Sequence, residues 1–249
     1  MFLDKLLNLI FPPLCLNCGK STAGFASPEA GSVQPKAGFA SPETGGEVLC
    51  AACSSLVKLN QTLFCGKCGL RLASGKKICH QDYPYLLGSA ADYGAVMKSL
   101  IHGLKFRFIK KAAEPLGKFL IRYTEGLSLP VQKFVVVPIP LSGTRLRERG
   151  FNQSELVAKI FADHFNLALE TKLLLRVKNT KPQSETRNLV ERKENIKECF
   201  AVITPEYLRG KNIILIDDVT TSGATLFEAA KVLKSAGVRK ILALTVAKA

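Results

Sequence analysis

The stretch IILIDDVTTSGATL, at residues 213–226, constrains the fold of this chain more than any other part of the sequence. Residues 213–216 form an entirely apolar and largely β-branched run, which is typical of a parallel strand buried on both faces. Asp217 and Asp218 stand at the carboxyl end of this run, and small and hydroxylated residues follow them. Apolar residues then recur at helical spacing up to Gly237, which favours a helix end. The stretch therefore predicts a strand, an acidic pair, a small loop and a helix.

This order of elements can bind a phosphorylated sugar. A loop that leads into a helix start directs backbone N–H groups and hydroxyls at a phosphate, and the helix dipole favours the negative charge. Two carboxylates would repel a phosphate, so we expect them to accept hydrogen bonds from sugar hydroxyls or to hold Mg²⁺. The alternative is an ordinary strand-to-helix turn with Ser222 as N-cap and a solvated acidic pair. The ordered motif favours the sugar phosphate, and it resembles the phosphoribosyl-pyrophosphate (PRPP) loop of type I phosphoribosyltransferases. The residues of this predicted PRPP site are Asp217, Asp218, Thr220, Thr221, Ser222, Gly223, Ala224 and Thr225.

Length and composition fit one ordinary domain with a small additional module. The chain has 249 residues, of which 47% are hydrophobic, and this content excludes disorder of the whole. The net charge of +15 suits pyrophosphate, nucleic acid or a solvated surface equally well. The apolar N-terminal segment is too short to span a bilayer and ends at Pro12-Pro13, so we expect a short packed helix and no membrane insertion.

Six of the eight cysteines form three CxxC pairs, which is the spacing of zinc ligands. This spacing favours zinc over disulfides and therefore a reducing, cytoplasmic location. Two of the pairs, Cys15 with Cys18 and Cys50 with Cys53, complete one tetrahedral site. Cys199 has no cysteine near it in the sequence, so we expect a buried structural thiol.

The third pair predicts a second metal site. Cys65 and Cys68 form the pair, and Cys79 with either His80 or Asp82 would complete the ligand set. The alternative is that these thiols share one ion with some of the other cysteines. The sequence leaves the choice between His80 and Asp82 open.

A repeat separates the first two cysteine pairs. AGFASPE occurs at residues 23–29 and again at residues 37–43, in a stretch rich in Gly, Ser and Pro. Such a stretch cannot bury enough apolar surface to fold, so we expect a disordered insertion at residues 21–46. We expect residues 1–87 to form the zinc module with this insertion, and residues 88–249 to form the larger domain.

The larger domain alternates predicted helices and strands, which implies a parallel, three-layer α/β sheet. Asn152 with Glu155 resembles a helix-capping arrangement. Ligands bind at the carboxyl ends of the strands in such sheets, and the basic loop after Pro138-Ile139-Pro140 leaves from such an end. Residues 178–198 break every apolar period, which favours a mobile loop. The helices are expected near residues 96–104, 112–120, 153–161 and 224–236, and the strands at residues 134–137, 173–177, 200–203, 213–216 and 240–246.

Several motifs occur together in one order along the chain. The CxxC pairs precede VVPIP, RLRERGFNQSELVA and TKPQ, and IDDVTTSGATL comes last. In this order they resemble the ComF family of competence-associated, phosphoribosyltransferase-like proteins. The resemblance implies a type I phosphoribosyltransferase fold behind an N-terminal zinc module, with PRPP and Mg²⁺ held at Asp217 and Asp218. The insertion and the residue in place of an expected cysteine, His80 or Asp82, depart from the family pattern.

The resemblance also implies a function and residues that would carry it out. Arg145, Arg149 and Arg192 would neutralise the leaving pyrophosphate, and residues 178–198 would form a lid. The expected reaction is transfer of the phosphoribosyl group to an unknown acceptor in the context of DNA uptake, with competence proteins as partners. The alternative is a non-catalytic PRPP sensor or a module that handles single-stranded DNA. Thr221 stands where several base-salvage enzymes place an aspartate, so the loop offers no visible general base. Phe106, Phe108 and Phe151 lie among basic residues and are the candidates for stacking on bases.

Overall fold

The structure is a computed structural model that describes residues 13–22, 47–72, 79–80, 82–178 and 196–249. The chain divides into two compact units, Met1–Leu56 and Val57–Ala249. The boundary that the motifs place after residue 87 stays a prediction, and residues 57–87 belong to the second unit by their contacts. The predicted N-terminal helix, the AGFASPE repeats and most of the predicted lid lie outside the described residues.

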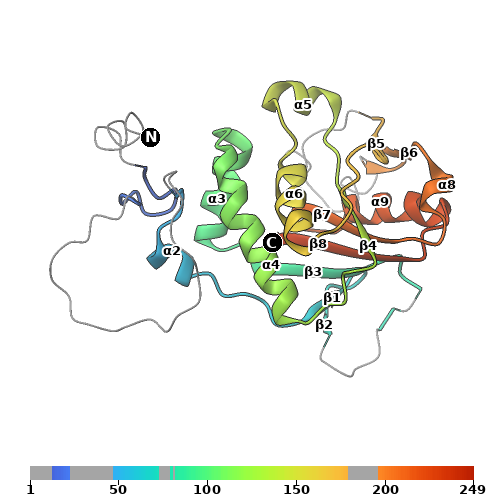
Figure 1. Cartoon of the computed structure of the whole chain (residues 1–249), viewed down its shortest axis with the longest axis horizontal. Coiled ribbons are helices and arrows are strands. Elements are labelled where there is room, and N and C mark those ends of the chain that lie inside the picture. The colour runs from blue at the N-terminus through green and yellow to red at the C-terminus, as the bar shows by residue number, and fades with distance from the viewer. Residues whose placement is uncertain (1–12, 23–46, 73–78, 81, 179–195) are drawn as a thin grey trace. The chain divides into compact units, whose positions relative to one another are not determined.

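The second unit is built on a six-stranded sheet with the order β2-β1-β3-β8-β7-β4. The neighbouring pairs β3 with β8, β8 with β7 and β7 with β4 are parallel, whereas β1 pairs antiparallel with β2 and β3. The parallel α/β prediction is therefore confirmed, with an antiparallel hairpin added at one edge (Figure 1). In chain order the strands are β1 (Leu63–Cys65), β2 (Arg71–Leu72), β3 (Leu86–Asp92), β4 (Phe134–Pro138), β7 (Asn212–Thr220) and β8 (Lys240–Lys248).

Helices cover both faces of this sheet. Helices α4 and α6 pack against each other and on the parallel strands, as Figure 1 shows. Ile213 and Leu215 of β7 pack instead with α9 in a separate buried cluster, while Ile214 and Ile216 point to the other face by strand alternation. All four side chains are fully buried, which confirms the predicted central strand. The helices are α2 (Ala51–Ser55) in the first unit and α3 (Ala95–Phe106), η1 (Lys110–Ala112), α4 (Ala113–Gly126), α5 (Gly143–Arg149), α6 (Gln153–Phe165), α8 (Pro205–Leu208) and α9 (Ala224–Ser235) in the second. None of the helices in the described part of the chain is long and apolar enough to cross a membrane.

Three local features differ from the sequence expectations. The basic segment after Pro140 is helix α5, which Ser142 caps and Gly150 ends at a φ of 74°. It buries no side chain, so no apolar period marked it as a helix. Strands β5 (Leu174–Arg176) and β6 (Phe200–Val202) pair with each other as a separate two-stranded sheet. Strand β3 was not expected, because its small residues have low strand propensity and its pairing with β8 supports it.

Helices α4 and α6 approach closely at Gly117. A Cβ atom placed there would lie 2.7 Å from Ile160 Cγ2, which is too close for any real contact. Gly117→Ala therefore overpacks the interface, and we expect the free energy of unfolding to fall by about 1–3 kcal/mol. Urea unfolding measures this change. Gly126→Ala in the same helix is the control, because a Cβ there meets nothing within 4 Å and alanine favours the helix. An equally stable Gly117→Ala variant would contradict the close approach.

Candidate functional site

The acidic pair is buried at the carboxyl end of β7. Asp217 is 9% exposed and Asp218 is 2% exposed. The Ser154 hydroxyl of α6 donates to Asp217 Oδ1 at 2.9 Å, and the backbone N–H of Asp218 donates to the same oxygen at 2.9 Å. Pairing of β7 with β8 continues past the pair to Thr220, so both carboxylates are held by a rigid strand rather than by a free loop. This arrangement excludes the solvated acidic pair of the alternative interpretation.

A lysine from a distant helix neutralises the pair in part. Lys105, near the end of α3, forms an ion pair with Asp218, and the two side chains are 22% and 3% exposed. Burial and the neighbouring Asp218 raise the pKa of Asp217 from 3.8 to about 7, although Lys105 and Ser154 act in the opposite direction. One lysine faces two adjacent carboxylates, so the pair keeps a net negative charge when both are ionised. Two carboxylates with this excess of negative charge are the hard oxygen donors that fit Mg²⁺.

The loop from Thr220 to Thr225, which we call the phosphate loop, leads directly into α9. Gly223 is the N-cap residue with a φ of 72°, and no side chain caps the helix. Ser222 is thus not the N-cap, and its buried hydroxyl has no hydrogen-bond partner. The first N–H groups of an α-helix have no partner within the helix, so the start of α9 is open to an anion.

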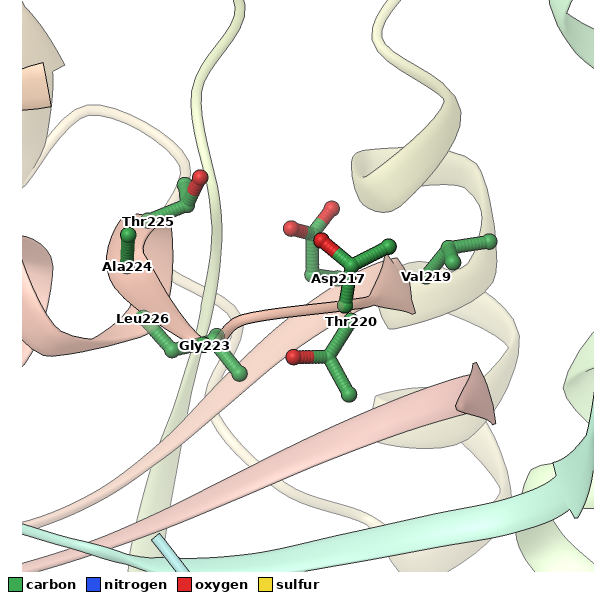
Figure 2. A pocket seen from close by; sticks show the side chains of 8 residues that line it. Asp217, Val219, Thr220, Gly223, Ala224, Thr225 and Leu226 are labelled. Carbon is green, nitrogen blue, oxygen red and sulfur yellow. The ribbon is translucent and has the colours of Figure 1, made fainter. Parts of the chain in front are cut away.

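Figure 2 shows the Asp217 carboxylate at the strand end and Thr225 on the first turn of the helix, on either side of this loop. Most of the predicted PRPP residues line one small pocket here, and Asp218 and Ser222 are not among them. The lining residues are Asp217, Val219, Thr220, Thr221, Gly223, Ala224, Thr225 and Leu226.

A larger cleft of about 590 Å³ connects the acidic pair with the arginines of α5. Arg145 and Arg149, both predicted from the sequence, line it together with Asp217, Asp218 and Thr225. Arg149 donates to Gln153 at the start of α6, and burial lowers the pKa of its guanidinium while Asp218 and Glu148 raise it. Arg192 lies outside the described residues. The structure thus places two of the three predicted pyrophosphate residues in the same cleft as the acidic pair.

Exposed aromatic side chains stand at the mouth of this cleft. Phe106 is 63% exposed and Phe108 is 52% exposed, and both line the cleft. The Arg149 guanidinium lies 6.0 Å from the centre of the Phe106 ring. Phe151 is only 8% exposed, so of the three candidate stacking residues only two are available at the surface.

Lys105 and Ser154 are site residues that the sequence analysis missed. Lys105 comes directly after Leu104, the last buried residue of α3. A lysine in the last turn of a helix is common, so its position alone does not indicate a site residue. Ser154 lies within the RLRERGFNQSELVA motif, and this motif is the sequence feature that could have indicated it as a site residue. Neither position could be connected with Asp217 or Asp218 without the tertiary structure.

The cysteines gather in two clusters whose geometry fits metal binding. The first cluster is Cys15, Cys18, Cys50 and Cys53, and the second is Cys65, Cys68, Cys79 and His80, with all ligand atoms of each cluster within 4.8 Å of one another. Asp82 does not belong to the second cluster among the described residues.

The distances within the clusters are those of a tetrahedral zinc site rather than of disulfides. The Cys18 and Cys50 Sγ atoms are 3.7 Å apart, and those of Cys68 and Cys79 are 3.5 Å apart. Tetrahedral zinc separates two sulfur ligands by about 3.8 Å, whereas a disulfide separates them by about 2.0 Å. All eight cysteines are free, and Cys199 is fully buried as expected. Each cluster could therefore hold a metal ion such as zinc.

The thiols of the second cluster differ in acidity. Burial raises the pKa of Cys65, but backbone N–H groups of Cys68 and Lys67 outweigh it and lower the pKa to about 6. Neighbouring Cys65 and Cys68 raise the pKa of Cys79 to about 11. The Cys65 thiolate therefore forms readily, whereas the thiols of Cys65 and Cys68 oppose deprotonation of Cys79. A divalent cation removes this opposition because it stabilises every thiolate that binds it.

Comparison with known proteins gives the same assignment for the fold and the motifs. Residues 152–249 match the phosphoribosyl transferase domain. The DNA utilization protein YhgH of Escherichia coli K12 is 32% identical over 198 residues, covering 74% of this chain and 83% of that protein. The chain belongs to the ComF family. Competence protein ComFC of Bacillus subtilis is 32% identical over 77% of this chain and 80% of that protein. Competence protein F of Haemophilus influenzae is 27% identical over 78% of this chain and 87% of that protein.

The raised pKa of Asp217 predicts a pH dependence of stability. Between pH 3.8 and about 7 the folded chain keeps a proton that the unfolded chain releases. The contribution of Asp217 to the free energy of unfolding therefore falls as pH rises through this window, by up to about 1.4 kcal/mol per pH unit, and is constant above it.

Urea unfolding of the wild type and Asp217→Asn from pH 5 to 8, without Mg²⁺, measures this dependence. The advantage of the wild type over the variant should shrink as pH rises. Asp163→Asn is the matched control, because its carboxylate is exposed on α6. A difference between wild type and Asp217→Asn that does not change with pH would contradict the buried, raised carboxyl group.

Proposed function

We propose that this chain binds PRPP with Mg²⁺ in the cleft and transfers the phosphoribosyl group to an acceptor. The observation that carries the proposal is one cleft with three parts. A buried acidic pair lies at a strand end, the uncapped start of α9 follows it, and the arginines of α5 lie across from it. These parts suit ribose hydroxyls, the 5-phosphate and pyrophosphate, in that order.

In this proposal the protein acts by positioning and by electrostatics. The phosphate loop fixes the 5-phosphate, and Asp217 and Asp218 accept hydrogen bonds from the ribose hydroxyls. The electron pair of the acceptor forms the new bond to C1, the bond from C1 to pyrophosphate breaks, and its electrons go to the pyrophosphate oxygen, where Arg145 and Arg149 stabilise the charge. Mg²⁺ held by Asp217 and Asp218 would supply further neutralisation of the charge on the leaving pyrophosphate. Thr221 offers no base, so an acceptor that already carries a free electron pair suits the cleft better than one that must first lose a proton.

Lys105 would change partners when PRPP binds. It pairs with Asp218 in the free cleft and lines the same cleft as Arg145 and Arg149, so it would meet a phosphate oxygen of the bound ligand there. An ammonium group suits both partners because it is a compact charge on a flexible stem. The proposed location is a reducing compartment such as the cytoplasm, where the thiols of both clusters remain available to a metal.

Isothermal titration calorimetry with PRPP and Mg²⁺ tests the binding. We expect saturable binding by the wild type and at least about 100-fold weaker binding by Asp217→Asn/Asp218→Asn, since each of the two lost charged hydrogen bonds costs about 1.5–3 kcal/mol. Asp163→Asn is again the control and should bind normally. No binding by the wild type would refute the ligand assignment. Release of pyrophosphate with a panel of nitrogenous acceptors would then separate an enzyme from a PRPP sensor.

A second candidate function is the handling of single-stranded DNA in DNA uptake, together with competence proteins. Exposed Phe106 and Phe108 beside Arg149 favour it, because aromatic rings next to cations bind unpaired bases. The names of the relatives, DNA utilization protein and competence protein, point in the same direction.

Fluorescence anisotropy with labelled single-stranded DNA tests this function. Affinity should fall steeply with salt concentration, because phosphate contacts release counterions. Phe106→Ala/Phe108→Ala should weaken binding about 10-fold or more with an unchanged salt slope, since stacking contributes about 1–3 kcal/mol per base. Ile203→Ala removes another exposed apolar side chain and is the control. A flat salt profile would exclude phosphate contacts as the source of binding.

A further inference from the structure

A buried tyrosine joins the second cysteine cluster to the phosphate loop. Tyr85 is 3% exposed, and its hydroxyl lies 3.4 Å from the Gly66 carbonyl and 3.3 Å from the Gly223 carbonyl. Gly66 stands between the ligand candidates Cys65 and Cys68, and Gly223 is the N-cap of α9. One hydroxyl therefore contacts both the turn that presents two thiols and the residue at which the phosphate-loop helix begins.

Aromatic ring contacts form a second connection between the cysteine turn and α9. The Tyr83 ring stacks on Phe227 of α9 with 5.3 Å between ring centres, and it lies 5.2 Å from the Tyr85 ring. Phe227 donates its backbone N–H to Gly223, so it belongs to the first turn of α9. The cluster and the helix start are thus joined by two side chains that also touch each other.

The cysteine turn, Tyr85 and the phosphate loop are packed too closely for a Cβ atom at Gly66 or Gly223. A Cβ atom at Gly66 would lie 2.8 Å from Tyr83 Cδ1 and 2.8 Å from the Tyr85 ring. A Cβ atom at Gly223 would lie 2.9 Å from the Tyr85 hydroxyl, and the φ of 72° disfavours a side chain there as well. Both glycines are therefore needed for the close approach. A shift of the cysteine turn cannot be absorbed by a gap and must pass to Tyr85 and the loop.

We propose that a metal ion held by Cys65, Cys68, Cys79 and His80 positions the phosphate loop, with Tyr85 as the residue that transmits this effect. The proposal rests on the proposed function only in assuming that the loop binds the phosphate of PRPP. Tyr85 touches no substrate in this scheme and is a positioning residue.

The physical reason lies in how weakly the cysteine turn is held otherwise. Strand β1 pairs with β3 at Phe64 and Cys65, but β2 has only two residues and lies at the edge of the sheet, so few strand contacts hold the far side of the turn. A metal ion that joins Cys65 and Cys68 to Cys79 and His80 fixes the turn and with it the Gly66 carbonyl. The Tyr85 hydroxyl, whose pKa burial raises, stays protonated, and its single O–H is shared between the two carbonyls. Metal binding and phosphate binding are then coupled, and each strengthens the other.

Tyr85→Phe tests the hydroxyl while it keeps the ring. Hydrogen exchange of the amides of residues 221–227, measured without any ligand, should become about 2-fold to 10-fold faster, as expected for the loss of one ordinary hydrogen bond. The dissociation constant for PRPP should rise by a similar factor, with no loss of zinc. Tyr123→Phe is the matched control, since Tyr123 is also a buried tyrosine that donates to a carbonyl, that of Thr62 at 2.7 Å. Exchange of residues 221–227 that is equal in both variants would overturn the role of Tyr85.

His80→Ala tests the metal, with His80→Cys as the rescue. His80→Ala should lose one zinc ion by elemental analysis and show the same faster exchange at residues 221–227. His80→Cys restores four ligands, so zinc content and exchange should return to the wild-type values. Loss of zinc without a change in exchange would overturn the coupling, and so would retention of both zinc ions by His80→Ala.

The exchange measurement separates this proposal from the proposed function. If the wild type binds no PRPP, the assignment of the ligand fails while the exchange data still decide whether the metal positions the loop. If a His80→Ala chain does not fold, exchange of residues 221–227 in the wild type before and after removal of zinc by a chelator tests the metal instead, and Tyr85→Phe still tests the hydroxyl.

Discussion

Burial of two adjacent carboxylates is the constraint on which the rest of the second unit depends. A buried charge is costly unless it is paired and hydrogen-bonded, and here two like charges are placed side by side. The Ser154 hydroxyl and the Lys105 ammonium reduce this cost from two different helices. Burial, and after it the neighbouring charge of Asp218, still raises the pKa of Asp217. Helices α3 and α6 are thus fixed relative to β7 by electrostatics as well as by packing, and a cation in the cleft would stabilise the same arrangement.

The two cysteine clusters differ in their relation to this centre. The first cluster lies in the small unit that ends at Leu56, where Leu49 is the one buried hydrophobic side chain besides Cys15 and Cys53 among the described residues. In such small modules a structural metal commonly replaces a hydrophobic core. The second cluster belongs to the larger unit, which has an extensive core of its own, so stability alone does not require a metal there. Its contact with the start of α9 gives it a different place in the molecule.

The sequence was most informative where local pattern and tertiary role coincide. The run Ile213–Ile216 is apolar because β7 is buried on both faces, so its position and its acidic end were predictable. Lys105 and Tyr85 were not, because each acts across a sequence distance of more than 100 residues. Helix α5 was missed because it packs no face and therefore has no apolar period. The choice between His80 and Asp82 depended on the path of the chain after Cys79, which spacing alone does not determine.

The hairpin of β1 and β2 covers the outer edge of β3, and this has a consequence for how the chain can be divided. Phe64 and Cys65 pair with Leu87 and Leu86, so β3 has a neighbour on each side. A chain that began at residue 88, where the motifs suggest that the larger domain starts, would lack this cover. The exposed hydrogen-bonding groups of a buried-type strand recruit strands from other molecules, which leads to aggregation. The cysteine-rich segment after Leu56 therefore covers the edge of β3, and its removal would expose that edge.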